Sequence, residues 1–211
     1  LDPAAVRQVL AQAGREIDSD FELASFLIDN SDRLLIDDGS RQAYFDAARS
    51  IDSDFEMRRV FSAVVKRGPV SPSTLGMMLG TSRNIESDFE AASLLIDVAK
   101  LQSLDTTTRP AFFGALDSVQ SDFEHRRVLS ALGTRGDLQQ ETVAAMLTSG
   151  ASVSSDFEAA SFLIQIAKQQ LIEGSIRTAF FRAVDSIDAG FERGRVLKAV
   201  AQRPDASPET I

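Results

Sequence analysis

The sequence contains no cysteine, no tryptophan and a single histidine, His125. Without cysteine the chain can form no disulfide, bind no zinc through thiolates and provide no cysteine nucleophile. With one histidine it cannot supply a site that needs two imidazoles. No apolar run approaches the roughly 20 residues of a membrane span, and no signal peptide is recognisable. We therefore expect no membrane span in this segment.

Basic residues are outnumbered by acidic ones. The chain has 22 Lys and Arg against 31 Asp and Glu, which gives a formal net charge of −9. Because an acidic chain repels phosphate backbones, the charge balance argues against a nucleic-acid partner. A composition with 44% hydrophobic and 25% charged residues is typical of a folded chain rather than a disordered one.

A hexapeptide motif recurs along the whole chain. It first reads Ile-Asp-Ser-Asp-Phe-Glu over residues 17–22, and its copies begin at residues 51, 85, 119, 153 and, in degraded form, 187. The motif phenylalanines follow a constant 34-residue period, at Phe21, Phe55, Phe89, Phe123, Phe157 and Phe191. A fixed period of this length is the signature of a repeat architecture.

Alternate repeats differ, so the full unit is a 68-residue pair. One type continues Glu-x-Ala-Ser-x-Leu-Ile, at residues 22–28, 90–96 and 158–164. The other continues Glu-x-Arg-Arg-Val, at residues 56–60 and 124–128, and 192–196 keeps only the second arginine. The predicted organisation is a single repeat array, with full repeats at 17–50, 51–84, 85–118, 119–152 and 153–186 and partial repeats at 1–16 and 187–211. Because the chain starts at Leu1 and both ends cut through a repeat, we expect it to be a piece of a longer array.

Each motif predicts the start of a helix. Ser19 and Glu22 have the spacing of a capping box, in which the Ser hydroxyl accepts from the backbone N–H three residues on and the Glu reaches back to the N-cap N–H. The acidic residues also lie in the first turn, where the helix dipole favours negative charge. In the sixth copy Ala189 and Gly190 replace Ser and Asp, so we expect a cap that is weaker or shifted to Asp188.

A second helix is predicted in every repeat. Ser71-Pro72, Ser207-Pro208 and Asp2-Pro3 pair an N-cap residue with proline at the first helical position. Asp37, Asp105 and Glu173 precede the other helices of this kind, and Arg67-Gly68 and Arg135-Gly136 are typical of helix ends. Two helices in each 34-residue repeat, with no strand alternation, predict an all-α fold. The expected form is an α-solenoid of stacked helical hairpins that bury their apolar faces against one another.

Aromatic residues are the expected anchors of this stack. We expect the motif phenylalanines, such as Phe89, to be buried between hairpins, so that replacing one by alanine costs roughly 3–5 kcal/mol. The adjacent pairs Tyr44-Phe45, Phe112-Phe113 and Phe180-Phe181 recur with the 68-residue period of the paired repeats. We expect both members of each pair in the core, with a groove-lining second member as the alternative.

The motif and its alternation resemble helical repeat arrays of some bacterial proteins. These arrays carry Ile-x-Ser-Asp-[Phe/Tyr]-Glu alternating with an Arg-Arg-Val-Leu form, and some follow a membrane metallopeptidase domain of the β-lactam-sensor type. The resemblance covers essentially the whole chain. It implies an α-solenoid outside the cytoplasm, periplasmic or at the cell surface, with no established activity of its own. The His-Glu-x-x-His motif of the peptidase is absent, so no protease function transfers. Tetratricopeptide repeats have the same 34-residue period, but this chain has no Trp and lacks their Leu-Gly…Tyr signature.

The acidic motifs also suggest a metal site, which the spacing disfavours. Asp52-x-Asp54-x-Glu56 resembles the start of a calcium loop, but Met57 and Ala63 occupy the positions that need Gly and Glu. A pair of carboxylates could serve glycoside hydrolysis, yet acids that recur in every repeat favour a structural role. His125 occupies the position that Met57 and Arg193 hold in the other repeats of the same type, and we expect it to be an exposed helix residue. We therefore expect no catalytic residue, no metal site and no cofactor.

The arginines of the second repeat type are the remaining polar feature. Arg58 follows Asp54 by four residues and Arg59 follows Glu56 by three, a spacing that favours salt bridges within a helix or between repeats. The alternative is a ladder that grips an acidic or carboxylate-bearing partner. The candidate contact residues of such a ladder are Arg58, Arg59, Arg126, Arg127 and Arg195.

Three functional hypotheses follow from this pattern. The first is a non-catalytic solenoid scaffold that binds a protein or peptide within a larger bacterial protein. The second is a structural spacer, or an array that assembles with copies of itself. The third, an enzyme with an unrecognised carboxylate site, has the least support, and we expect the chain not to be an enzyme.

Overall fold

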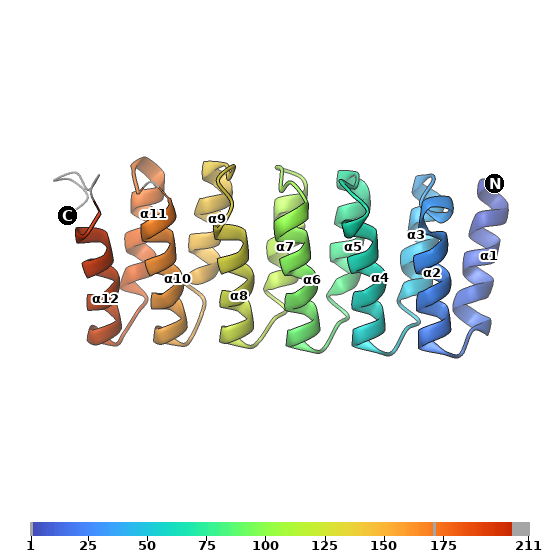
Figure 1. The fold of residues 1–211 in the computed structure, drawn as a ribbon, viewed down its shortest axis with the longest axis horizontal. Helices are drawn as coiled ribbons and strands as arrows, with labels where there is room; N and C mark the ends of the chain where they lie inside the picture. The colour runs from blue at the N-terminus through green and yellow to red at the C-terminus, as the bar shows by residue number, and fades with distance from the viewer. Residues whose placement is uncertain (1, 171, 204–211) are drawn as a thin grey trace. The chain divides into compact units, whose positions relative to one another are not determined.

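The computed structural model describes residues 2–170 and 172–203, and the regular structure in them is entirely α-helical (Figure 1). Twelve helices occur in this part of the chain, without a strand. The even-numbered helices begin at residues 20, 54, 88, 122, 156 and 190, which repeats the sequence period of 34. The predicted all-α fold of two helices per repeat is confirmed.

The chain divides into two compact units, Leu1–Ser118 and Val119–Ile211. We call them the first and the second unit. Their boundary coincides with the start of a sequence repeat, at residue 119.

Each unit is a stack of helical hairpins in two layers, and helices pack against the next helix of their own layer (Figure 1). The first unit has one layer made of α1 (Pro3–Glu16), α3 (Asp38–Ala48), α5 (Pro72–Ser82) and α7 (Thr108–Leu116), and another made of α2 (Asp20–Leu34), α4 (Asp54–Lys66) and α6 (Asp88–Leu101). The second unit has α9 (Gln140–Gly150) and α11 (Gly174–Asp185) in one layer, and α8 (Asp122–Gly133), α10 (Asp156–Gln169) and α12 (Gly190–Ala201) in the other. Consecutive hairpin stacking of this kind defines an α-solenoid.

The serine half of the predicted capping box is confirmed. Each motif serine accepts a hydrogen bond from the backbone N–H of the glutamate three residues on, at 3.3–3.4 Å, and these N-caps are Ser19, Ser53, Ser87, Ser121 and Ser155. In the sixth copy the N-cap is Ala189, which makes no side-chain cap. The expected weaker cap is therefore present, whereas the alternative shift to Asp188 is wrong.

The glutamate half of the predicted capping box is wrong. An aspartate of the preceding repeat, rather than the glutamate, accepts the hydrogen bond from the backbone N–H of the N-cap serine. The backbone N–H of Ser87 donates to Asp54 of the preceding repeat at 2.7 Å, and the N–H of Glu86 donates to the same carboxylate at 3.1 Å. Asp20, Asp122 and Asp156 hold the next repeat in the same way. The motif aspartate is therefore a bridge between repeats as well as a first-turn acid.

A buried glutamine connects repeats at the other end of the even-numbered helices. Gln102, which follows α6, donates to the carbonyl oxygens of Val65 and Gly68 at 3.0 Å and accepts from the N–H of Val70 at 3.0 Å. Gly68 has a φ of 141°, a left-handed conformation that favours glycine, and the predicted end of α4 at Arg67-Gly68 is confirmed. The predicted end at Arg135-Gly136 is one residue late, since the C-cap of α8 is Thr134.

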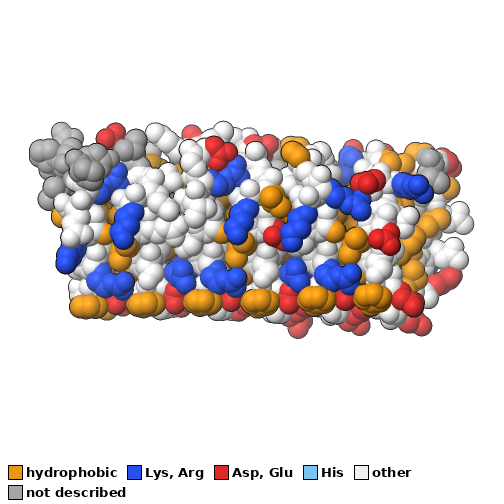
Figure 2. Space-filling model, viewed as in Figure 1, with side chains coloured by type: hydrophobic (Ala, Val, Ile, Leu, Met, Phe, Trp, Pro, Cys, Tyr) orange, Lys and Arg blue, Asp and Glu red, His pale blue; other side chains and the backbone are white. Residues whose placement is uncertain are grey.

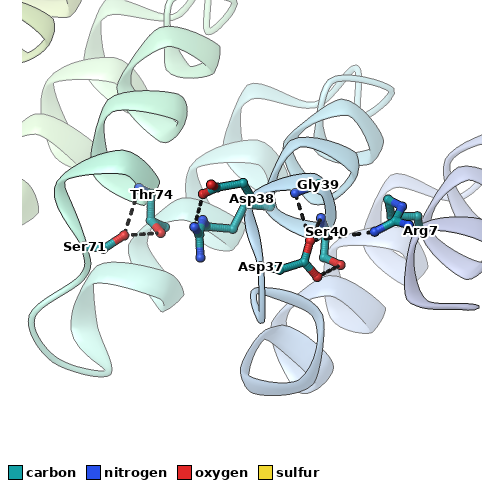
Figure 3. A network of polar contacts seen from close by, with 8 residues as sticks. Arg7, Asp37, Asp38, Gly39, Ser40, Ser71 and Thr74 are labelled. Carbon is teal, nitrogen blue, oxygen red and sulfur yellow. Dashed lines mark hydrogen bonds and ion pairs between the residues drawn. The ribbon is translucent and has the colours of Figure 1, made fainter. Parts of the chain in front are cut away.

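The odd-numbered helices begin largely as predicted. Pro3 and Pro72 open α1 and α5 behind the N-caps Asp2 and Ser71, while Ser207-Pro208 lies outside the described residues. Asp37 caps α3 by accepting from the N–H groups of Gly39 and Ser40, at 2.9 and 3.1 Å (Figure 3). The hydroxyl and N–H of Ser40 lower the pKa of this carboxyl. Stabilising hydrogen bonds to the ionised form cause that direction.

The aromatic pairs are the anchors of the core, with one qualification. Tyr44, Phe45, Phe112 and Phe180 are almost completely buried, whereas Phe113 and Phe181 are half-buried, so core packing of both members holds only for the first pair. The Tyr44 hydroxyl donates to the carbonyl of Leu27 at 3.2 Å, which satisfies it inside the core. Burial raises the pKa of this hydroxyl, because its charged form would lose its hydration.

Replacing Ser87 by alanine removes one helix cap and leaves the rest of the repeat in place. We expect the free energy of unfolding to fall by about 1 kcal/mol, since a lost Ser N-cap typically costs that much. Chemical denaturation monitored by circular dichroism measures it. The matched control is Ser154→Ala, because Ser154 is exposed and precedes the cap Ser155; equal losses in the two variants would contradict the cap assignment.

Candidate functional site

The motif phenylalanines are exposed, which corrects the expectation that they anchor the core. Their exposed fractions range from 49% for Phe55 to 78% for Phe191. We call these residues the Phe edge: Phe21, Phe55 and Phe89 in the first unit, and Phe123, Phe157 and Phe191 in the second. Figure 2 shows hydrophobic side chains gathered where the even-numbered helices of each unit begin. The inter-hairpin contacts come instead from residues such as Phe61 and Phe162.

The position of these phenylalanines in their helices explains the exposure. Each is the second residue of an even-numbered helix, and all but Phe191 follow a serine cap and an aspartate. In α10 the buried residues Ala159, Phe162, Leu163 and Ile166 share one face, and a rotation of about 100° per residue carries Phe157 well away from it. The 3.6-residue period, applied to each helix separately, would have predicted this.

Arginine guanidinium groups lie over the phenylalanine rings. Arg58 lies over the ring of Phe55 on its own helix, with 5.0 Å to the centroid. Arg59 reaches back to the ring of Phe21 in the preceding repeat, at 5.4 Å. The second unit repeats both contacts, with Arg126 on Phe123 at 5.2 Å and Arg195 on Phe157 at 5.4 Å. All of these distances fall within the range of cation–π attraction.

The same arginines are held in ion pairs with the motif glutamates. Arg59, Arg127 and Arg195 pair with the glutamate three residues earlier on their own helix, as the spacing predicted. Arg58 pairs with Glu90 of the next repeat, and Arg126 with Glu158, rather than with the aspartates four residues before them. The arginine side chains are 20–35% exposed, and their charges are balanced locally.

The structure therefore brings all five candidate contact arginines to the Phe edge, Arg58 and Arg59 in the first unit and Arg126, Arg127 and Arg195 in the second. Arg193, in the degraded sixth copy, instead donates to the carbonyl oxygen of Ile187. The phenylalanines themselves are the residues of this site that the sequence reasoning missed.

The two units differ in the charges beside their phenylalanines. The residue before each serine cap is exposed, and in the first unit it is acidic: Asp18, Asp52 and Glu86. Neither an ion pair nor a side-chain hydrogen bond reaches these three carboxylates from the described residues. At the equivalent positions the second unit has Gln120, Ser154 and Asp188. Asp and Glu side chains project along this edge of the first unit in Figure 2.

His125 is buried, which corrects the expectation that it is an exposed helix residue. It is 6% exposed, and its Nε2 lies 2.8 Å from the hydroxyl oxygen of Ser149 on α9. Met57, its sister residue, is also buried, so both occupy the same inward position of the helix. The imidazole is a satisfied core residue.

One surface hollow of the first unit contains charged side chains. A hollow of about 280 Å³ in the first unit is lined in part by Asp32, Arg67 and Pro69. The guanidinium of Arg67 is engaged there by the Asp32 carboxylate at 2.7 Å and the carbonyl oxygen of Ile28 at 2.6 Å. Within residues 2–170 and 172–203, no cluster of three or more His, Asp or Glu side chains could hold a metal ion.

The stacked hairpins and the Phe edge place the chain in the class of α-solenoid repeat proteins. Compared with known proteins, the chain matches no family model, no curated protein and no solved structure. The helices of the described residues are too short or too polar to cross a membrane.

Proposed function

We propose that this α-solenoid is a non-catalytic scaffold that binds a protein or peptide along its Phe edge. The observation that carries the proposal is the exposure of the motif phenylalanine, which is about half or more in every repeat. Large aromatic side chains are normally buried, and exposed apolar patches on folded proteins typically mark interaction sites. Exposed phenylalanine rings add little to the buried core. A role in recognition therefore explains why a phenylalanine recurs at this exposed position.

The edge is also well ordered for binding. Arg58 and Arg59 lie over phenylalanine rings and hold them in place. Both arginines are themselves fixed by ion pairs with motif glutamates. Rigid aromatic side chains lose little conformational entropy on binding, which makes them efficient contact residues. Repetition along the stack supplies several equal contacts, and linked contacts of this kind raise the overall affinity.

Self-assembly through the Phe edge is the competing proposal, and the charges of the first unit count against it. Two copies that met along this edge would bring the free carboxylates of Asp18, Asp52 and Glu86 close to those of the second copy. Like charges that face each other across an interface cost free energy. The resemblance to bacterial arrays extends the favoured proposal to a scaffold within a larger bacterial protein.

Selection from a random-peptide library tests the proposal. Peptides that bind the unmodified chain are measured against the variant F21A/F55A/F89A, in which the edge of the first unit is removed. We expect most selected peptides to lose at least about tenfold in affinity, because a single aromatic anchor is commonly worth more than 1 kcal/mol in binding.

A matched control separates the edge from general hydrophobicity. The variant V9A/I36A/L101A removes three exposed apolar side chains of the same unit that lie away from the starts of the even-numbered helices. Circular dichroism spectra should be unchanged in both variants. Peptides that bind both variants equally well would refute a binding role for the Phe edge of the first unit. A concentration-dependent oligomer lost only in F21A/F55A/F89A would favour self-assembly.

A further inference from the structure

We propose that the occupant of the Phe edge in the first unit is an extended basic peptide segment with Lys or Arg at about every third residue. This inference rests on the proposed binding function and adds the chemistry of the partner. Three features of the edge carry it: the balance of its charges, the accessible phenylalanine rings and the spacing of the repeats.

The exposed residues directly before the serine caps of this edge are all acidic. Arg58 and Arg59 are already paired with Glu90 and Glu56, so they contribute no net positive charge to a partner. Asp18, Asp52 and Glu86 are exposed and hold unpaired carboxylates beside the phenylalanines. The chain as a whole has a net charge of −9, which strengthens the attraction for a cation. Charge complementarity therefore selects a basic partner rather than an acidic one.

The phenylalanine rings suit the same partner. Phe21 and Phe55 each accept a guanidinium of the chain itself over the ring, at 5.4 and 5.0 Å, and still remain 60% and 49% exposed. A Lys or Arg of a partner can contact the accessible ring surface while its charge lies near the carboxylate three residues before that phenylalanine. Aromatic side chains next to carboxylates are a favourable environment for cations.

The repeat spacing sets the spacing of the cations. Helices of one layer pack about 8–10 Å apart, so successive phenylalanines of the first unit present equivalent contacts at about that interval. A polyproline II segment rises about 3.1 Å per residue with three residues per turn, so every third side chain lies on one face about 9 Å from the next. A β-strand covers a similar distance in three residues but turns alternate side chains to opposite faces. The polyproline II form therefore matches the edge better.

Fluorescence anisotropy with labelled (Arg-Pro-Pro)4 tests this inference. The comparison peptides are (Glu-Pro-Pro)4 and a peptide of the same composition whose four arginines are contiguous. We expect (Arg-Pro-Pro)4 to bind more tightly than both, with an affinity that falls as salt is added, because exposed charge attraction is screened. Tighter binding of (Glu-Pro-Pro)4 would overturn the inference and favour the arginine ladder.

Two charge variants locate the binding. D18N/D52N/E86Q removes the free carboxylates of the edge, and we expect it to weaken (Arg-Pro-Pro)4 binding by about fivefold or more. D29N/D32N/D97N removes the same number of charges from the later turns of α2 and α6, and we expect a much smaller change. Equal effects of the two variants would mean that only the net charge of the chain attracts the peptide, which overturns the inference.

The phenylalanine variant separates this inference from the proposed function. (Arg-Pro-Pro)4 should lose most of its affinity for F21A/F55A/F89A, and undiminished binding there would overturn the inference. If library peptides depend on the phenylalanines but carry no basic residues, the proposed function stands and the basic partner is excluded. If no library peptide depends on the phenylalanines, the proposed function itself fails.

Discussion

Phe162→Ala is expected to lower the free energy of unfolding by about 3–5 kcal/mol, the usual cost of emptying a buried phenylalanine site. Phe162 lies on α10 with 0% exposure, and its ring lies so close to Gly150 on α9 that a Cβ added at Gly150 would clash with it. The ring therefore fills the contact between α9 of one repeat and α10 of the next. Its loss leaves a cavity that neither backbone can easily close.

Phe157→Ala on the same helix is the matched control. Phe157 is 55% exposed, and the guanidinium of Arg195 lies over its ring, at 5.4 Å from the centroid. We expect a loss of about 1 kcal/mol or less, which is the range of an exposed cation–π contact. Urea denaturation of the two variants measures the difference. Similar losses would mean that the edge phenylalanines stabilise the fold as much as the core ones, and would remove the reason for assigning them to binding.

Asp54→Ala is expected to lower the free energy of unfolding by about 1.5–3 kcal/mol, through the loss of charge-assisted hydrogen bonds to the next repeat. Its carboxylate accepts from the backbone N–H groups of Glu86 and Ser87, at 3.1 and 2.7 Å. The variant leaves both N–H groups without this acceptor at the start of α6. Amide hydrogen exchange at residues 86 and 87 should accelerate more than exchange in the middle of α4.

Asp52→Ala is the control for this change. Asp52 belongs to the same motif and carries the same charge, but its exposed carboxylate has no partner among the described residues. We expect its stability to change by less than about 0.5 kcal/mol, as is usual for surface substitutions. If the two aspartate variants were equally unstable, the effect would arise from motif charge near the helix start, and the bridge between repeats would be refuted.

The reasoning from sequence succeeded where the determinant is local. Serine caps, proline at the first helical turn and the glycine after Arg67 each act within a few residues, so the starts and ends of most helices could be predicted. It missed the end of α8 by one residue, because the C-cap there is Thr134 rather than Arg135. It also failed for the glutamate half of the capping box, because the backbone N–H groups that the glutamate would accept from are bonded to an aspartate of the preceding repeat.

The candidate site was predicted in part. The five arginines were singled out, and the pairing of Arg59 with Glu56 follows from their spacing on one helix. The pairing of Arg58 with Glu90 and the contact of Arg59 with Phe21 join different repeats, so no spacing within one helix reveals them. The edge phenylalanines were assigned to the core from their residue type, although their position as second helical residue directs them outward.

The sequence alone determined the period, the helical class and the stacking, because a 34-residue unit with its own helix starts can bury its apolar face only against its neighbours. Only the tertiary structure decided which aromatic residues that stacking covers and which charges remain unpaired. Both depend on how one hairpin lies against the next, and this geometry places Phe162 inside, Phe157 outside and the carboxylates of Asp18, Asp52 and Glu86 free beside the Phe edge.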